Sequence, residues 1–194
     1  MRMATTQRQT LETKVFVRLH LDGTGQAKVQ TGIGFFDHML TLLAVHGLLD
    51  LEVQCTGDLQ VDGHHSVEDI GITLGDALQE ALGDKAGIAR YGSFLLPMDE
   101  TLARVALDVS GRPFLVYHAP AMAPMIGNYD TELTEEFLRA LAMHAGITLH
   151  AQVLYGKNAH HMTEALFKAL GHALRLACAH DPRQQGVPSS KGIL

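Results

Sequence analysis

The sequence predicts an α+β fold that arises by internal duplication, with two sheets and helices packed on one face. The pattern His-His-x-x-Glu occurs at residues 64–68 and again at 160–164, 96 positions later. The segment 37–47 also aligns with 135–145, at an offset of 98. Both halves read as strand, strand, helix, strand, helix. Paired strands before a helix favour an α+β arrangement over a wholly parallel sheet.

The duplication divides the chain into two half-repeats and a tail. The 194 residues suffice for one large domain or two small ones. We expect half-repeats at 1–93 and 94–181 and a C-terminal tail at 182–194, which together form a single functional domain.

Apolar patterns locate the elements of the first half. Val15, Val17 and Leu19 alternate with other residues, which is typical of a strand buried on one face. Apolar residues recur at every third or fourth position after Val67, which indicates a helix. The expected elements are a loose polar segment at 1–10, strands at 14–21 and 27–31, a helix that Gly32 and Gly34 open and that ends near Gly47, a strand at 51–56 with a continuation at 59–61, and the helix of the first motif, ending at Gly83.

The same reasoning covers the second half. Asp181-Pro182 stops its last helix, because the residue before proline disfavours the helical conformation. The expected elements are a connector at 85–99, strands at 102–109 and 114–117, a loop at 119–128, a helix at 131–144, a strand at 147–154, and the helix of the second motif, reaching about Ala179.

Composition narrows the class of protein. The net charge of −6 argues against non-specific nucleic-acid binding. Two cysteines, Cys55 and Cys178, form no disulfide framework and fit a reducing compartment. The N-terminus lacks an apolar signal core, and no apolar run approaches the about 18 residues of a membrane span. We therefore expect a cytoplasmic protein that binds neither nucleic acid nor membrane.

The two His-His-x-x-Glu motifs indicate metal sites. On a helix His64 and Glu68 share one face, whereas the adjacent His65 points about 100° away. Each motif is therefore expected to feed two separate sites, within a subunit or across subunits. Imidazole and carboxylate ligands without thiolate favour manganese or iron over zinc or nickel. Surface histidines at helix starts are the alternative, and the matched repetition argues against it.

The duplication suggests two further ligands. His38 precedes the first motif and Glu136 precedes the second, at equivalent positions of the two halves. Each is expected to complete the set of metal ligands of its own half. His46 and His144 are expected to be helix C-terminal caps. The expected ligands for two ions are His38, His64, His65, Glu68, Glu136, His160, His161 and Glu164.

Several cations and hydroxyls suit a phosphate group. Arg90 lies in a glycine-bounded loop, Arg112 lies in a Ser-Gly-Arg-Pro turn, and Lys168 follows Glu164 by one helical turn. The tail contributes Ser189, Ser190 and Lys191. Solvated arginines and a disordered C-terminus remain the alternative reading of these residues.

With these motifs the chain resembles the imidazoleglycerol-phosphate dehydratase family, lyases of histidine biosynthesis. The matching stretches run over nearly the whole chain: Phe36-Asp37-His38-Met39-Leu40, residues 62–69, Ser110-Gly111-Arg112-Pro113, residues 156–161 and Pro188-Ser189-Ser190-Lys191-Gly192. The resemblance implies dehydration of imidazole glycerol phosphate to imidazole acetol phosphate.

The same resemblance implies a cofactor and an assembly. It implies two manganese ions per active site and a homo-oligomer of twenty-four subunits with sites between subunits. It also implies Glu12 as the acid/base residue, with Asp99 a second candidate. Several family members have histidine where Glu136 stands, so the charge of that site is expected to differ here. A binuclear metallohydrolase such as a phosphatase, or a non-catalytic shell assembled by metals, are the alternative functions.

Overall fold

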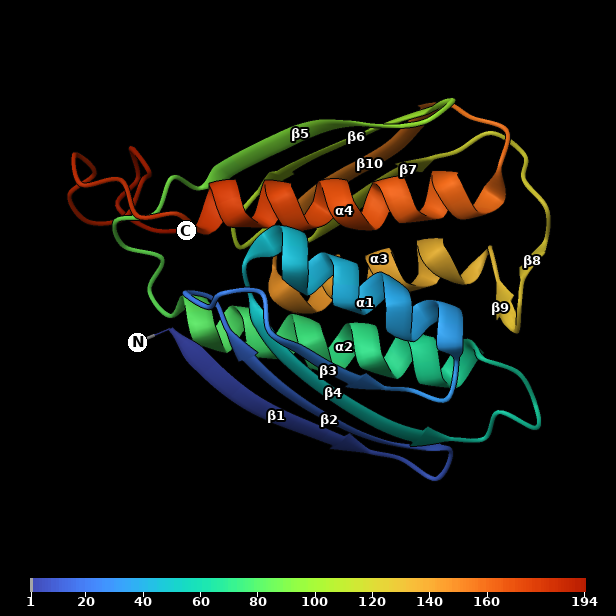
Figure 1. Ribbon diagram of the computed structural model, residues 1–194. Coiled ribbons are helices and arrows are strands. Elements are labelled where there is room, and N and C mark those ends of the chain that lie inside the picture. The colour runs from blue at the N-terminus through green and yellow to red at the C-terminus, as the bar shows by residue number, and fades with distance from the viewer. Residues whose placement is uncertain (1) are drawn as a thin grey trace.

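The computed structural model describes residues 2–194. Two four-stranded sheets form the outer layers, and four helices fill the space between them (Figure 1). Each sheet therefore has helices on its inner face, and the α+β fold with two sheets is confirmed.

The first half supplies one sheet and two helices. Its elements are β1 (Met3–Gln9), β2 (Thr13–His20), β3 (Ala27–Gln30), α1 (Gly34–Gly47), β4 (Asp50–Gly57) and α2 (His64–Leu82). The strand order is β1-β2-β4-β3. β3 pairs in parallel with β4, and the other neighbours are antiparallel.

The second half repeats this arrangement. Its elements are β5 (Tyr91–Met98), β6 (Thr101–Asp108), β7 (Phe114–His118), α3 (Leu133–Ala145), β10 (Thr148–Tyr155) and α4 (Ala159–Cys178). The order β5-β6-β10-β7, with β7 parallel to β10, matches the first sheet strand for strand. A small hairpin of β8 (Met125–Ile126) and β9 (Tyr129–Asp130) interrupts the second half before α3.

Four strands were not expected. The segment at 1–10 was predicted to be loose but contains β1, the connector at 85–99 contains β5, and the short strands β8 and β9 stand at the end of the loop expected at 119–128. β1 buries only Ala4, so its sequence carries no apolar alternation, and its backbone pairing with β2 holds it instead. The continuation at 59–61 is a turn. The boundary expected after residue 93 falls inside β5, and the large sheet of each half has one strand more than predicted.

The two halves exchange helices in the core. α1 packs on α4 of the other half, and α3 packs on α2. Gly75 in α2 and Gly171 in α4 lie at these crossings. A Cβ atom on Gly75 would lie 2.6 Å from the Cβ atom of His144, and one on Gly171 would lie 2.7 Å from the carbonyl oxygen of Leu43. Both glycines permit the close approach of the helix backbones.

All four helices begin at the same end of the molecule, on the right in Figure 1. The N-termini of α2 and α4, which carry the two His-His-x-x-Glu motifs, therefore lie at one end, and the C-terminal tail lies at the other. In the part of the chain from residue 2 onward, none of the helices has the length and apolar character needed to cross a membrane.

Candidate active site

The two motifs form the first turns of α2 and α4. The Asp62 carboxylate accepts a hydrogen bond from the backbone N–H of His64 at 2.8 Å, and the Asn158 side chain accepts one from that of His160 at 2.9 Å. These bonds satisfy N–H groups that a helix start leaves free. In each motif the two imidazole rings stand nearly perpendicular, at 84° and 82°. Adjacent histidines therefore diverge and can serve different sites.

Three of the expected ligands come together in one cluster. The Glu164 Oε2 atom lies 2.9 Å from His160 Nε2 and 3.3 Å from His38 Nε2. An ion with nitrogen and oxygen ligands at about 2.1 Å, set at right angles, has neighbouring ligand atoms about 3 Å apart. The spacing and chemistry of His38, His160 and Glu164 therefore fit a divalent metal ion.

The grouping of His38 corrects the expectation that it completes the set of its own half. His38 belongs to α1, which packs on α4, so it reaches the motif of the second half. The same exchange packs α3, with Glu136, on α2. There the His64 Nε2 and Glu68 Oε2 atoms lie 3.7 Å apart, while the carboxylate of Glu136 lies 3.8 Å from the Arg139 Nε atom. Among residues 2–194, only the cluster with His38 brings three or more such groups within 4.8 Å of one another.

Carboxylates orient the second histidine of each motif. His65 Nδ1 lies 3.0 Å from an oxygen of Asp58, and His161 Nδ1 lies 2.8 Å from Glu100 Oε2. Because a carboxylate only accepts, each Nδ1 carries the proton, and each Nε2 presents a lone pair. The hydrogen bond that His65 donates to Asp58 raises the pKa of His65, and the one that His161 donates to Glu100 raises the pKa of His161.

The two acid/base candidates stand beside these same histidines. A carboxylate oxygen of Glu12 lies 3.8 Å from the Nε2 atom of His65, and one of Asp99 lies 3.8 Å from the Nε2 atom of His161. Glu12 is in the turn between β1 and β2, and Asp99 is in the turn between β5 and β6. The exposed fractions of their side chains are 53% and 78%.

Sequence reasoning missed the two orienting carboxylates. Glu100 was available as a signal, because Glu-Thr occurs at 12–13 and again at 100–101, at the start of matching strands. Asp58 follows the end of β4 and has no counterpart at the end of β10, so the duplication could not reveal it.

The expected phosphate-binding residues fall into two groups. Lys168 lies beside the cluster of His38, His160 and Glu164, with its Nζ atom 2.5 Å from Glu164 Oε1. Arg90 donates to Asp108 at 2.7 Å and to the carbonyl oxygen of Pro188 at 2.8 Å, and Arg112 lies 3.4 Å from the same Asp108 carboxylate. The hydrogen bond to Asp108 raises the pKa of Arg90. Through Pro188 the second group joins the tail that carries Ser189, Ser190 and Lys191.

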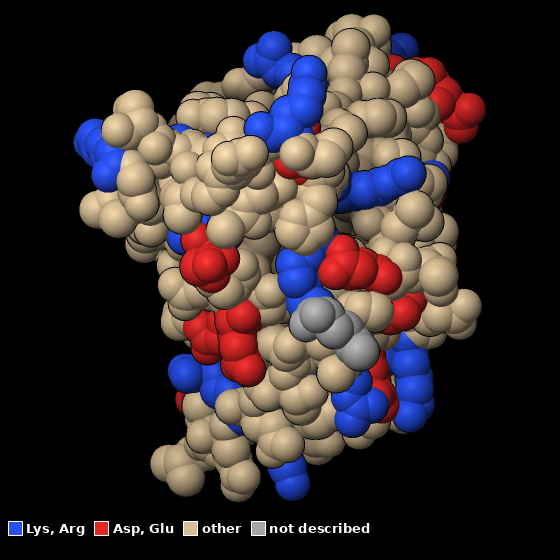
Figure 2. All heavy atoms as spheres, turned by 90° about the vertical axis from the view of Figure 1, so that its left-hand side faces the viewer, with Lys and Arg blue, Asp and Glu red and all other residues tan. Residues whose placement is uncertain are grey.

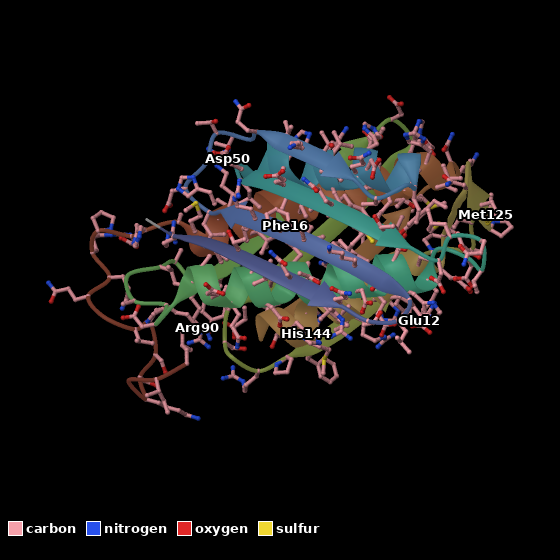
Figure 3. The ribbon with its side chains drawn as sticks, turned by 90° about the horizontal axis from the view of Figure 1, so that it is seen from below. Glu12, Phe16, Asp50, Arg90, Met125 and His144 are labelled. Carbon is pink, nitrogen blue, oxygen red and sulfur yellow. The ribbon has the colours of Figure 1, made fainter. Side chains whose placement is uncertain are left out.

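These two groups lie at opposite ends of one chain. α4 has 20 residues, which at 1.5 Å per residue span about 30 Å, and the tail begins beyond its C-terminus. Figure 3 shows the same separation, with Glu12 near one end and Arg90 near the other. Figure 2 looks onto the tail end, where lysine and arginine side chains are interspersed with acidic ones. One chain therefore does not unite Arg90, Arg112 and the tail with the metal-ligand candidates.

Comparison with known proteins places this arrangement in a family. The imidazoleglycerol-phosphate dehydratase family profile matches residues 31–174. The imidazoleglycerol-phosphate dehydratase of Exiguobacterium sp. is 58% identical over 192 residues, 99% of this chain and 98% of that protein. The protein of the same name from Methylorubrum extorquens is 57% identical over 195 residues and matches along 100% of both chains.

Two solved structures share the fold. The crystal structure of the Staphylococcus aureus imidazoleglycerol-phosphate dehydratase has a TM-score of 0.84 at 41% identity, covering 92% of this chain and 99% of its own. The Pyrococcus furiosus enzyme, in complex with (S)-C348, has a TM-score of 0.83 at 37% identity, covering 97% and 99%. By sequence and by fold, the chain belongs to the imidazoleglycerol-phosphate dehydratase family.

Proposed function

We propose that this chain dehydrates imidazole glycerol phosphate to imidazole acetol phosphate with two divalent metal ions, at sites shared between copies of the chain. The reaction and its place in histidine biosynthesis follow from the family. The metal dependence rests on one observation above the others, the convergence of His38, His160 and Glu164.

Eight side chains would hold the two ions. They comprise the cluster of His38, His160 and Glu164, the pair of His64 and Glu68, and the residues His65, His161 and Glu136. Nitrogen and oxygen ligands without sulfur favour manganese. When bound, the ions supply Lewis-acid stabilisation for negative charge on the substrate's ring.

The side chains of the protein handle the proton. The net reaction removes a hydroxyl group from the carbon attached to the ring and a proton from the next carbon, leaving an enol that becomes the ketone. The Glu12 carboxylate is the acid/base group for this transfer, since it is exposed beside His65 Nε2. A carboxylate oxygen of Asp99 lies at the same distance, 3.8 Å, from the Nε2 atom of His161, and Asp99 is the second candidate.

The positions of the proposed phosphate-binding residues support a homo-oligomer. Arg90, Arg112 and the tail residues Ser189, Ser190 and Lys191 lie about one α4 length, roughly 30 Å, from the helix starts. The tail end of one copy would therefore bind the phosphate of a substrate held at the helix starts of another copy, where Lys168 lies. The assembly of twenty-four subunits that the family resemblance implies provides such contacts. The cytoplasm is the proposed location.

The test combines metal removal with one substitution. Elemental analysis of the purified protein should give two manganese ions per chain. Prolonged chelation should abolish ketone formation and yield smaller species on size exclusion, and added manganese should restore both. Glu164→Gln should lower metal content, whereas His150→Gln, an exposed histidine on β10, should not. Full turnover after verified metal loss would refute the metal dependence, and release of inorganic phosphate would indicate a phosphatase instead.

A further inference from the structure

The hairpin turns of the two halves differ in how they are fastened to the long helices. Thr13 and Thr101 begin the second strand of each hairpin, and both are buried. Glu12 and Glu100 precede them, so these two glutamates occupy equivalent positions in the duplicated unit. They nevertheless have different surroundings.

In the second half the glutamate itself fastens the turn. Glu100 Oε1 accepts hydrogen bonds from the backbone N–H groups of Asn158 at 2.8 Å and Lys157 at 3.0 Å, just before α4. Its Oε2 atom accepts from His161 at 2.8 Å. The bonds from His161, Asn158 and Lys157 hold the pKa of Glu100 far below its ordinary value. Because both of its oxygens accept hydrogen bonds, the Glu100 carboxylate is not available as an acid/base group.

In the first half the glutamate is free. Within residues 2–194 no hydrogen bond involves the Glu12 carboxylate, which lies beside His65 with its side chain 53% exposed. At the start of α2, the Asp62 carboxylate, rather than Glu12, accepts the hydrogen bond from a backbone N–H, that of His64. Figure 3 shows Glu12 at the end of the molecule where β1 turns into β2.

A buried carboxylate takes over the fastening there. Asp69 of α2 is only 7% exposed and accepts a hydrogen bond from the Thr13 hydroxyl through Oδ2. Its Oδ1 atom accepts from Arg8 Nε of β1 at 2.6 Å. Asp69 thus ties both strands of the hairpin to the helix. The corresponding residue of α4 is Ala165, which has no such group.

The turn itself is ordered from within. The Thr10 hydroxyl accepts from the backbone N–H groups of Glu12 at 3.1 Å and Thr13 at 3.0 Å. Fixing Thr13 to α2 therefore fixes the backbone of Glu12 with respect to His65 and Glu68, which are on the same helix as Asp69.

The geometry points to Asp69 as a positioning residue for the dehydration. It fastens the β1–β2 turn to α2 through Thr13 and Arg8 and leaves the Glu12 carboxylate free to exchange a proton with the substrate. A buried, hydrogen-bonded carboxylate can hold a reacting group at a fixed place, which matters because a displacement of about 1 Å can cost roughly 100-fold in rate. This inference rests on the role proposed for Glu12.

The experiment uses the assembled, metal-loaded protein and two ways of breaking the tie. Asp69→Asn and Thr13→Val should each lower kcat by about 10- to 100-fold and leave KM within about 2-fold. Thr13→Ser, which keeps the hydroxyl, should behave like the parent. Manganese content should not change, and amide hydrogen exchange should become faster in a peptide covering residues 9–14.

A matched control separates positioning from general attachment of the strand. The Thr6 hydroxyl also joins β1 to α2, donating to the carbonyl oxygen of Thr73 at 2.9 Å, away from the turn. Thr6→Val should keep the parental kcat and the slow exchange of residues 9–14. If it reduced kcat as much as Thr13→Val, attachment of the strand alone would account for the effect, and the inference would fail.

A double-mutant cycle tests whether Asp69 acts through Glu12. In a Glu12→Gln background, at enzyme concentrations that resolve the residual turnover, Asp69→Asn should lower kcat by a further factor of less than about 2. Fully multiplicative losses, or a parental kcat in both Asp69→Asn and Thr13→Val, would overturn the inference and leave Glu12 in its role. A parental kcat in Glu12→Gln alone would overturn both this inference and the role proposed for Glu12.

Discussion

Replacing Gly92 by alanine should displace α4, the helix that carries His160 and Glu164. Gly92 lies in β5 against the backbone of α4. An added Cβ atom would lie 1.9 Å from the carbonyl oxygen of Ala173 and 2.9 Å from the backbone nitrogen of Ala177. The first distance is about 1.5 Å short of an ordinary contact. Because the opposing atoms are backbone in a buried helix, no side chain can rotate away.

The magnitude follows from two opposing contributions. Overpacking of a core costs about 1–3 kcal/mol, and the size of this overlap puts Gly92→Ala at the upper end. Alanine recovers about 0.5–1 kcal/mol of the backbone entropy that glycine loses in a strand. The net loss should be about 2 kcal/mol or more, which for a chain of 194 residues lowers Tm by about 4–8 °C.

Two measurements check this expectation. Thermal and urea unfolding followed by circular dichroism give the stability, and kcat reports whether α4 has shifted the metal-ligand cluster. Gly34→Ala is the matched control, since a Cβ atom there meets nothing within 4 Å, and its Tm should equal or slightly exceed that of the parent. If Gly92→Ala unfolded within about 1 °C of the parent with unchanged kcat, the close approach of β5 to α4 would not matter.

Three further outcomes are expected. Glu136→Ala should lose one of two metal ions and collapse turnover, and Glu136→His should restore much of the binding; two retained ions in Glu136→Ala by elemental analysis would contradict this. Lys191→Ala should weaken substrate capture by roughly 1.5–3 kcal/mol in kcat/KM without changing metal content, and parental kinetics would remove the tail from the site. The ring centroids of His172 and Phe94 lie 4.0 Å apart, and burial lowers the pKa of His172. Because the unfolded chain binds a proton at His172 more readily than the folded chain does, the free energy of unfolding should fall as pH drops below about 6.5. His172→Phe keeps the stack and should reduce the dependence of Tm on pH between 7 and 5, whereas an unchanged slope would place that dependence on other groups.

The sequence predicted the elements whose apolar residues recur with a period. β2, with Val15, Val17 and Leu19, and the long helices α2 and α4 appear where the pattern indicated. β1 and β5 were missed for different physical reasons. β1 buries one alanine, so backbone pairing rather than apolar side chains forms it. β5 packs Phe94, Leu96 and Met98 on the core, but the exposed Leu95 and the inward Gly92 obscure the alternation in its sequence.

The candidate site was predictable in its parts but not in its grouping. The spacing within each motif placed the two histidines at a helix start with diverging rings. The slot that His38 shares with Glu136 was visible in the duplication, yet the duplication does not specify which helix packs on which. That choice depends on the exchange of α1 and α3 between the halves, a tertiary feature without a local signature.

The helix exchange also bears on how such a chain could arise and how it can be cut. Because α1 covers α4 and α3 covers α2, a single half leaves its long helix without the cover it has in the whole chain. A half-length ancestor could bury the same surfaces only as a symmetric pair, and fusion of two copies would convert that pair into one chain. Two fragments obtained by cutting the connector between α2 and β5 should therefore fold only when they are mixed, because each supplies the helix that covers the long helix of the other.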